Sequence, residues 1–414
     1  MPRTLLLLAL ATLAPAQDWP AFRGPAGDGT TPCKTAPLEW DAETNVRWRV
    51  PLARPANGSA IVSGGFVFLA MAEDDGGRAR SLYCYDRRTG AQVWARTVEH
   101  DHVMPTHRTN PYGGSTPASD GQRVVVWHAS AGLYCYDLAG EPQWEKDLGE
   151  FRHMWGYGTS PVIHGEQVLL HTGPGSRSFL LCFDLATGEE LWRHEEPDHL
   201  TAEEREAKRI AGSWCTPLVR DDVVICAQPT RVLAHDLATG EVLWSCGGLR
   251  STRGDMVYSS PLLTDDLCVI QGGYVGPSIG VRLGGEGEVT ESHRAWFHPE
   301  RFSSCGSGVF VDGVLLLPDM GGMLYCLDPA SGEALWKERL GRGESWSSIV
   351  ACAGRLYMTL QSGETVVFRG TREGLEVLAR NPLEETSNAT PAFSDGEVFL
   401  RTHDALWCLA EERS

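Results

Sequence analysis

Three histidines have the spacing of metal ligands. The segment EHDHVMPTH places His100, His102 and His107 within eight residues. Imidazole nitrogens bind Zn²⁺ and Cu²⁺, so this spacing could hold such an ion. The segment is expected to be a loop between two strand-rich units, where solvated histidine clusters also occur. We therefore keep the three histidines as candidates and predict no metal site.

Motifs for other enzyme chemistry are missing from the sequence. The twelve cysteines include no adjacent pair, and neither a Cys-x-x-Cys-His haem sequence nor a Gly-x-Ser-x-Gly nucleophile elbow occurs. The glycine-rich runs at 173–178 and 284–288 do not lie between a strand and a helix, as a phosphate-binding loop requires. We expect both runs to be hairpin turns.

A set of aromatic, histidine and amide residues could form a binding site. Rings and amides that converge at the mouth of a channel could bind a small ligand or a peptide. The alternative is that they pack and hydrogen-bond among themselves and close the channel. The sequence leaves both interpretations open, favours closure, and gives catalysis the least support. The set comprises His107, Asn110, Tyr112, Trp155, Tyr157, His171, Trp214, Tyr258, Tyr274, Trp346, Asn388 and His403.

Repeated units of about 50 residues must position these side chains. SLYCYDRRTGAQVW ends at Trp94, LLCFDLATGEELW ends at Trp192, and MLYCLDPASGEALW ends at Trp336. Each unit opens with Ser/Thr-Pro or a looser version of it, followed by a turn, as in STPASDG from Ser115. Short alternating apolar runs lie between opening and close, which indicates four strands per unit. Such a unit is one blade of a β-propeller, and eight registers can be counted.

The ends of the sequence predict how the ring closes. The eighth unit stops at LWCLAEERS without a fourth strand, whereas residues 45–50, NVRWRV, contain an unassigned one. We expect this N-terminal strand to complete the last blade and so remove an open sheet edge. The predicted fold is all-β: one eight-bladed propeller of four-stranded antiparallel blades over residues 17–414. A helical insertion is expected at 201–211, where Thr201 and Glu204 form a capping-box pattern.

Residues that recur in each unit are given structural roles. Asp in the D-x-x-T/S-G sequences is expected to bond its own turn backbone, and the repeated Trp to pack between blades. Cys84, Cys135, Cys182, Cys326 and Cys408 share one register and are expected to be buried thiols, since equivalent points in adjacent blades are too far apart for a disulfide. The remaining cysteines could include a bridge, but the sequence does not pair them.

The Y-x-x-D-x-x-T-G-x-x-x-W units, in looser form, resemble the pyrroloquinoline-quinone-type β-propeller repeat family. This family includes quinoprotein dehydrogenases and the outer-membrane assembly factor BamB. DWPAFRGPAGDG, GSWCTP and NATPAFSDG resemble secreted bacterial members of the planctomycete type. The resemblance covers nearly the whole chain and implies the fold more strongly than a function. In the dehydrogenases an adjacent cysteine pair commonly covers the quinone. Its absence here disfavours pyrroloquinoline quinone with Ca²⁺ as a cofactor.

The N-terminus and the charge predict the compartment and exclude some partners. Arg3, an apolar run from Leu5 and Ala14-Pro15-Ala16 form a signal peptide over residues 1–16, too short to span a bilayer. The net charge of −18 argues against nucleic acid and anionic membranes. We predict an exported, periplasmic or extracellular monomer without a transmembrane segment. It would act as a non-catalytic scaffold for an envelope or extracellular protein, a peptide or a small ligand. A quinone- or metal-dependent oxidoreductase is the alternative.

Overall fold

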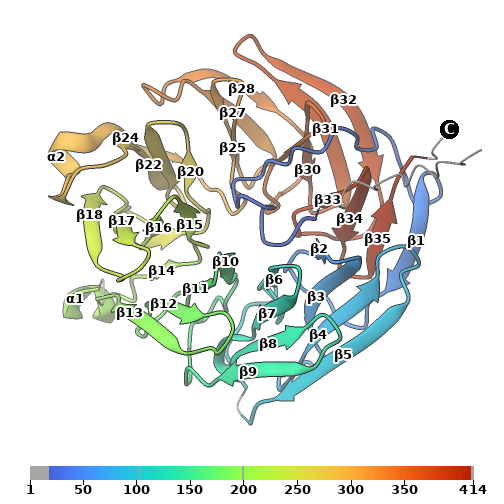
Figure 1. The fold of residues 1–414 in the computed structure, drawn as a ribbon. Coiled ribbons are helices and arrows are strands. Elements are labelled where there is room, and N and C mark those ends of the chain that lie inside the picture. Colours follow the sequence, from blue (N-terminus) through green and yellow to red (C-terminus); the bar gives the residue numbers. More distant parts are fainter. Residues whose placement is uncertain (1–17, 102, 198–199, 412–414) are drawn as a thin grey trace, which may run out of the picture.

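The computed structural model describes residues 18–101, 103–197 and 200–411, so the predicted signal peptide and His102 lie outside the described residues. Antiparallel sheets follow one another around a central axis and form an eight-bladed β-propeller, as predicted (Figure 1). Within the described residues no helix is long and apolar enough to cross a membrane.

In the first half of the ring, each blade runs from an innermost strand beside the axis to an outer strand at the rim. Blade 1 contains β2 (Ile61–Ser63), β3 (Phe66–Ala72), β4 (Ala79–Asp86) and β5 (Gln92–Glu99). Blade 2 contains β6 (Ala118–Ser119), β7 (Arg123–Trp127), β8 (Leu133–Asp137) and β9 (Pro142–Lys146), with a 3₁₀ turn at Ala129–Ala131. Blade 3 contains β10 (Val162–His164), β11 (Gln167–His171), β12 (Phe179–Asp184) and β13 (Glu190–Glu195). Blade 4 contains β15 (Leu218–Arg220), β16 (Val223–Ala227), β17 (Arg231–Asp236) and β18 (Val242–Gly247).

The second half repeats this order. Blade 5 contains β20 (Leu262–Leu263), β21 (Leu267–Gln271), β22 (Gly276–Arg282) and β24 (Arg294–Phe302). Blade 6 contains β25 (Val309–Val311), β26 (Val314–Pro318), β27 (Met323–Leu327) and β28 (Ala334–Arg339). Blade 7 contains β29 (Val350–Cys352), β30 (Arg355–Thr359), β31 (Glu364–Gly370) and β32 (Leu375–Pro382). Blade 8 contains β33 (Ala392–Ser394), β34 (Glu397–Arg401), β35 (Ala405–Leu409) and β1 (Val46–Pro51).

The N-terminal strand closes the ring as the sequence predicts. Strand β1 pairs antiparallel with β35, and Val46 lies opposite Leu409. Side chains of β1 alternate between half-buried and exposed, whereas β35 is buried throughout. This is the pattern of an outer strand on a strand that is covered on both faces. Blade 8 is therefore assembled from both ends of the chain.

The repeat residues lock neighbouring blades together. In blade 3 the register residue Cys182 pairs with Trp192 across β12 and β13. The Trp192 indole donates to the Leu237 carbonyl of the next blade at 2.9 Å. The indole also lies against Gly240, which has a φ of 74° and so suits a turn residue without a side chain. Equivalent indole bonds of 2.7–3.0 Å are made by Trp48, Trp94, Trp144, Trp296 and Trp336.

The innermost strands are joined by side-chain hydroxyls from the Ser/Thr-Pro openings. In each such contact, a backbone N–H donates to the Ser or Thr hydroxyl at the equivalent position of the next blade. These bonds satisfy backbone donors that lie outside the sheets' own ladders. The donor and acceptor pairs are Thr390–Ser59, Ser59–Thr116, Thr116–Ser160, Ser160–Thr216, Ser260–Ser307, Ser307–Ser348 and Ser348–Thr390.

Insertions make blades 3 to 5 irregular. Helix α1 (Ala202–Glu206) follows blade 3, and its capping box joins Thr201 and Glu204, within the segment expected to be helical. Strand β14 (Ala211–Ser213) then pairs in parallel with β19 (Asp255–Val257). A second insertion contains β23 (Gly287–Glu288), which adds to the outer edge of blade 4, and α2 (Thr290–His293).

Candidate functional site

The loops that precede the innermost strands, and the hairpins between second and third strands, form one face of the ring, here called the loop face. At its centre four amides form a chain across blades 7, 8, 1 and 2. Gln361 donates to Asn388 at 2.8 Å, and Asn388 donates to Asn57 at 3.0 Å. Asn57 donates to Asn110 at 3.3 Å, and His403 Nε2 lies 3.4 Å from the Asn57 oxygen. These amides are therefore engaged with one another.

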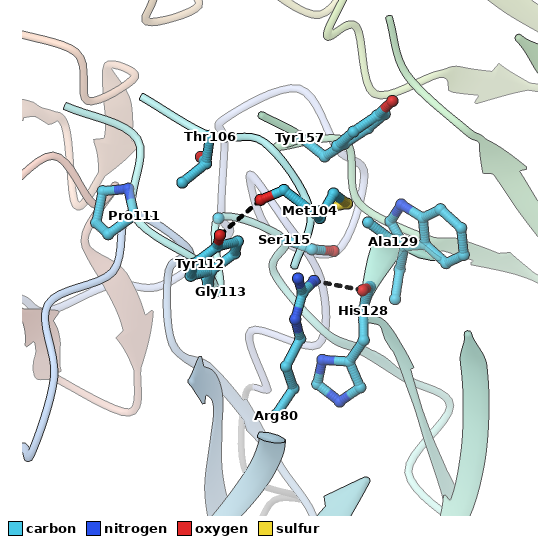
Figure 2. Close-up of a pocket in the computed structure, with 12 residues that line it drawn as sticks. Arg80, Met104, Thr106, Pro111, Tyr112, Gly113, Ser115, His128, Ala129 and Tyr157 are labelled. Carbon is cyan, nitrogen blue, oxygen red and sulfur yellow. Dashed lines mark hydrogen bonds between the residues drawn. The ribbon is translucent and has the colours of Figure 1, made fainter. Parts of the chain in front are cut away.

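A small pocket adjoins this chain, over blades 1 and 2 (Figure 2). Tyr112 donates its hydroxyl hydrogen to the Met104 carbonyl at 2.6 Å, and the Arg80 guanidinium lies 4.8 Å from the centre of the Tyr112 ring. Burial, with help from Arg80, lowers the pKa of His128 to about 3, so this imidazole is neutral. The space left is about 20 Å³, which is room for one water molecule.

Aromatic residues of the predicted set form two contacts farther around the loop face. The His107 and Trp155 rings are in contact, with centres 4.3 Å apart and planes tilted by 47°. Trp214 lies between His153, at 5.0 Å, and Tyr258, at 5.2 Å. Burial lowers the pKa of His153 to about 4. We call His153, Trp214 and Tyr258 the aromatic row.

The other members of the predicted set are placed as follows. Asn110 also donates to the Trp155 carbonyl at 2.8 Å. Tyr157 lines the small pocket, and its hydroxyl is buried without a hydrogen-bond partner among the described residues. Trp346 lies in the segment between β28 of blade 6 and β29 of blade 7, and Tyr274 is 46% exposed. The predicted residues are thus distributed over several separate contacts.

The opposite face is formed by the turns that join the first strand to the second and the third strand to the fourth in each blade. Residues 18–37, here called the N-terminal strap, cover its centre (Figure 1). Trp19 bridges to Val62 in blade 1, and Thr30 bridges to Ala351 in blade 7. Between them Arg23 is fully buried and donates to the Gly308 carbonyl of blade 6 at 2.7 Å. Burial lowers the pKa of Arg23 to about 10.

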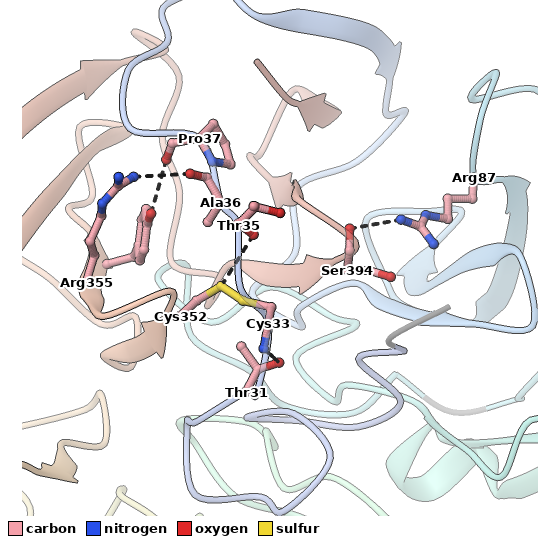
Figure 3. Close-up of a disulfide and its surroundings, with 10 residues drawn as sticks. Thr31, Cys33, Thr35, Ala36, Pro37, Arg87, Cys352, Arg355 and Ser394 are labelled. Carbon is pink, nitrogen blue, oxygen red and sulfur yellow. Dashed lines mark hydrogen bonds between the residues drawn. A yellow bond between two sulfur atoms is a disulfide. The ribbon is translucent and has the colours of Figure 1, made fainter. Parts of the chain in front are cut away.

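A disulfide fastens the strap to blade 7 (Figure 3). It joins Cys33 to Cys352, whose Cα atoms are 5.8 Å apart. Arg355 donates to the Ala36 carbonyl at 3.2 Å beside it. Both cysteines belong to the off-register set that the sequence could not pair, and the register cysteines are free and buried as predicted.

The hollow of the loop face lies over blades 3 and 4. A cavity of about 420 Å³ is bounded by the hairpin after β11, by helix α1 and by the segment that leads to β14. Its apolar wall includes His153, Met154, Pro174 and Ile210, and its basic rim includes Arg152, Arg205, Lys208 and Arg209. Met154 is 59% exposed, and Lys208 makes no ion pair within the described part of the chain. Two segments of this lining stand out in the sequence, the glycine-rich run at 173–178 and the insertion at 201–211, and neither was predicted to form a cavity.

Behind one wall of this cavity is a buried polar cluster. His171 Nε2 lies 3.0 Å from a Glu196 oxygen, and its Nδ1 lies 3.0 Å from the Cys215 carbonyl oxygen. Donor atoms of His171, Glu196 and Cys226 all lie within 4.8 Å of one another. Burial alone would lower the pKa of His171, but the Glu196 carboxylate outweighs it and raises that pKa. Of these residues the sequence singled out His171 alone as a site candidate.

The predicted histidine cluster is only partly visible. His107 Nδ1 lies 2.7 Å from the Thr109 hydroxyl, and His100 follows β5. Among the described residues neither belongs to a group of three possible metal ligands. Because His102 lies outside those residues, the cluster stays a prediction.

Pyrroloquinoline quinone with Ca²⁺ does not fit the residues present. The pocket over blades 1 and 2 has room for one water, not for a tricyclic quinone. Ca²⁺ takes six to eight oxygen ligands, and the described lining of the larger cavity offers one carboxylate, Glu196, which already bonds His171 and Ser178.

Blade number, strap, indole contacts and N-terminal closure together define a β-propeller of the quinoprotein-repeat class. The chain belongs to the family whose model is described as outer membrane protein assembly factor BamB, which matches residues 78–337 and 320–412. No curated protein matches the sequence significantly.

Solved structures share the fold at low identity. BamB from Moraxella catarrhalis is 13% identical with a TM-score of 0.62, over 88% of this chain and 99% of that one. Quinohemoprotein alcohol dehydrogenase from Comamonas testosteroni is 12% identical with a TM-score of 0.66, over 96% of this chain and 81% of that one. The computationally designed protein Ika8 is also 12% identical, with a TM-score of 0.60 over 88% and 99%. At such identities the likeness concerns the fold alone.

Proposed function

We propose that this protein is a non-catalytic scaffold that holds an extended segment of a partner protein in the cavity over blades 3 and 4. The cavity itself carries the proposal, since it offers about 420 Å³ on the loop face, whereas the pocket over blades 1 and 2 has room for about 20 Å³. Rigid blades beneath irregular loops are a common basis for binding sites. Membership of a family described as an assembly factor supports a protein partner.

The lining of the cavity suggests the chemistry of that segment. An apolar residue would find Met154, Pro174 and Ile210 on one side of the cavity. A carboxylate would find the basic rim on the other side. The described lining residues hold four cationic side chains and one carboxylate. Arg209 and Arg152 already pair with Asp255 and Glu150, at 2.7 and 2.9 Å, so Lys208 is the cation of the rim that a carboxylate would meet first. Such local complementarity steers an acidic partner and fixes its orientation. A segment with an apolar anchor next to an acidic residue fits best.

The compartment of this scaffold is part of the proposal. We place the mature protein, after removal of residues 1–16, in the periplasm or outside the cell, as a monomeric propeller. The apolar N-terminal segment supports export. The Cys33–Cys352 disulfide supports an oxidising compartment.

Pull-down from envelope extract tests the partner, with the mature protein as bait. The double variant Arg152→Glu, Lys208→Glu reverses two charges of the rim and should lose the partner that the wild type recovers. Arg88→Glu reverses an exposed charge in a turn on the opposite face and serves as the matched control. Equal recovery by all three proteins would overturn the cavity as the binding site.

A second measurement tests the absence of catalysis. The protein is given pyrroloquinoline quinone and Ca²⁺, and dye-linked oxidation of alcohols and sugars is followed together with the melting temperature. We expect neither turnover nor stabilisation. Turnover would establish the oxidoreductase alternative and overturn the non-catalytic role.

A further inference from the structure

The buried cluster behind the cavity wall has the donors of a transition-metal site. It combines an imidazole, a carboxylate and a thiol from three segments of two adjacent blades. His171 ends β11, Glu196 follows β13, and Cys226 lies in β16. The side chain of His171 has no exposed area and that of Glu196 has 2%, and Cys226 is 1% exposed. Imidazole nitrogen, carboxylate oxygen and thiolate sulfur are each ligands that Zn²⁺ takes in proteins.

The surroundings of His171 orient it as a ligand. Its Nδ1 lies 3.0 Å from the Cys215 carbonyl oxygen, an acceptor that fixes the proton on that nitrogen. Nε2 then faces Glu196 and can supply a lone pair once the ion-pair proton leaves. Metal-bound histidines characteristically use a carbonyl or carboxylate partner on the other ring nitrogen in this way.

The charge of the cluster suits a divalent ion. The Glu196 carboxylate and a Cys226 thiolate together carry two negative charges, and neutral His171 adds none. Zn²⁺ binds cysteine as the thiolate and histidine as the neutral imidazole, so binding releases the protons that these groups carry and metal affinity depends on pH.

An ion has a route to the cluster from the cavity. Glu196 and Ser178 line the cavity of about 420 Å³, and Ser178 donates to the Glu196 carboxylate at 2.8 Å. His171 and Cys226 lie deeper. Glu196 thus connects the cluster to the cavity, and the cluster is not enclosed on all sides by the core.

We propose that His171, Glu196 and Cys226 form a binding site for Zn²⁺ at the base of the cavity over blades 3 and 4. Three protein ligands leave a fourth position of the tetrahedral ion, which Cys215 or a group from the cavity can fill. The proposal stands independently of the partner protein, because it concerns the cluster and not the basic rim.

Zn²⁺ stoichiometry tests the site. The full-length mature protein is stripped with a chelator, loaded with Zn²⁺ and desalted, and the metal is counted by mass spectrometry. We expect one ion per wild-type chain. Calorimetry in buffers of different ionisation enthalpy should report proton release. A wild-type chain that retains no Zn²⁺ would overturn the proposal.

Variants of the proposed ligands test where the ion binds. Cys226→Ser and the isosteric Glu196→Gln should each weaken Zn²⁺ binding at least ~10-fold, the lower end of what even outer-shell changes cause. Cys182→Ser alters an equally buried cysteine in blade 3 that belongs to no group of three possible ligands among the described residues, and should bind as the wild type does. Co²⁺ should give a thiolate-to-cobalt charge-transfer band in the wild type and in Cys182→Ser, but not in Cys226→Ser. Unchanged binding and an unchanged band in the Cys226 and Glu196 variants would place the ion elsewhere.

Discussion

Trp144 of blade 2 and Gly188 of blade 3 are in direct contact: a Cβ atom added to Gly188 would lie 2.6 Å from the Trp144 indole. Gly188 belongs to the D-x-x-T-G turn, in which the Asp184 carboxylate accepts a bond from the Thr187 backbone at 2.7 Å. The Trp144 indole donates to the Leu185 carbonyl of the same turn at 2.9 Å. The turn and the outer-strand Trp of the preceding blade therefore form one interlocking unit.

Gly188→Ala should destabilise the protein more than Gly165→Ala. Both glycines have a positive φ, 69° and 57°, but nothing lies within 4 Å of a Cβ at Gly165. Each alanine costs about 1–2 kcal/mol for its left-handed backbone. The clash with Trp144 adds a further ~1–3 kcal/mol at Gly188. Urea unfolding measures the difference, and equal losses for the two variants would show that the indole contact does not constrain the turn.

Removing the disulfide should loosen the strap. The double variant Cys33→Ser, Cys352→Ser is expected to lose ~2–5 kcal/mol of unfolding free energy, because the bridge closes a very long loop. Reductant should destabilise the wild type and leave the double variant unchanged. Alkylation of the unreduced, denatured wild type should label ten thiols. Labelling of all twelve would show that the bridge is not formed.

Acid should destabilise the protein partly through His128. Burial lowers its pKa to about 3 in the fold, whereas an unfolded chain binds the proton near pH 6.5. Stability is therefore lost as the pH falls from about 6.5 towards 3, at up to ~1.4 kcal/mol per pH unit. In His128→Gln, the unfolding free energy should fall less steeply with decreasing pH, as measured by urea titrations at pH 7, 5.5 and 4. His164→Gln changes an exposed histidine and should leave the slope as in the wild type, so parallel slopes in all three proteins would refute the assignment.

Trp214→Ala should weaken binding of the partner. Trp214 packs between His153 and Tyr258, and its indole donates to the Gly156 carbonyl at 3.0 Å. Its loss removes the support of His153, which lines the cavity. The expected cost is ~2 kcal/mol or more, as for a central aromatic anchor. Trp346→Ala, between blades 6 and 7, should bind normally. The affinity of each variant for the recovered partner is the measurement. Equal losses of affinity in Trp214→Ala and Trp346→Ala would argue against a site over blades 3 and 4.

The fold could be predicted from the sequence because its units are local and repeated. The D-x-x-T-G turn and the following Trp specify two strands and their register, as Cys182 opposite Trp192 illustrates. Closure by residues 45–50 followed from counting strands, and the observed β1 is Val46–Pro51. Both inferences need only the order of residues along the chain.

The site was less predictable because it depends on contacts between blades. Asn57 and Asn388 precede the innermost strands of blades 1 and 8, but the sequence does not show that they lie within hydrogen-bond distance of each other. The cavity results from an insertion whose path repeat counting does not give. Cys226 lies at a second-strand position that is Leu, Val, Ile or Met in the other blades, so aligning the units by register would have singled it out.

Joining both ends of the chain in blade 8 also sets the order of assembly. Val46 has no partner strand until Leu409 has been made, so the ring cannot close on a growing chain. Seven blades can form beforehand, each from contiguous sequence, but blade 8 must wait. A chain synthesised from its N-terminus therefore stays an open arc until β35 has been made. Until then, no closed ring has to be opened for the chain to unfold.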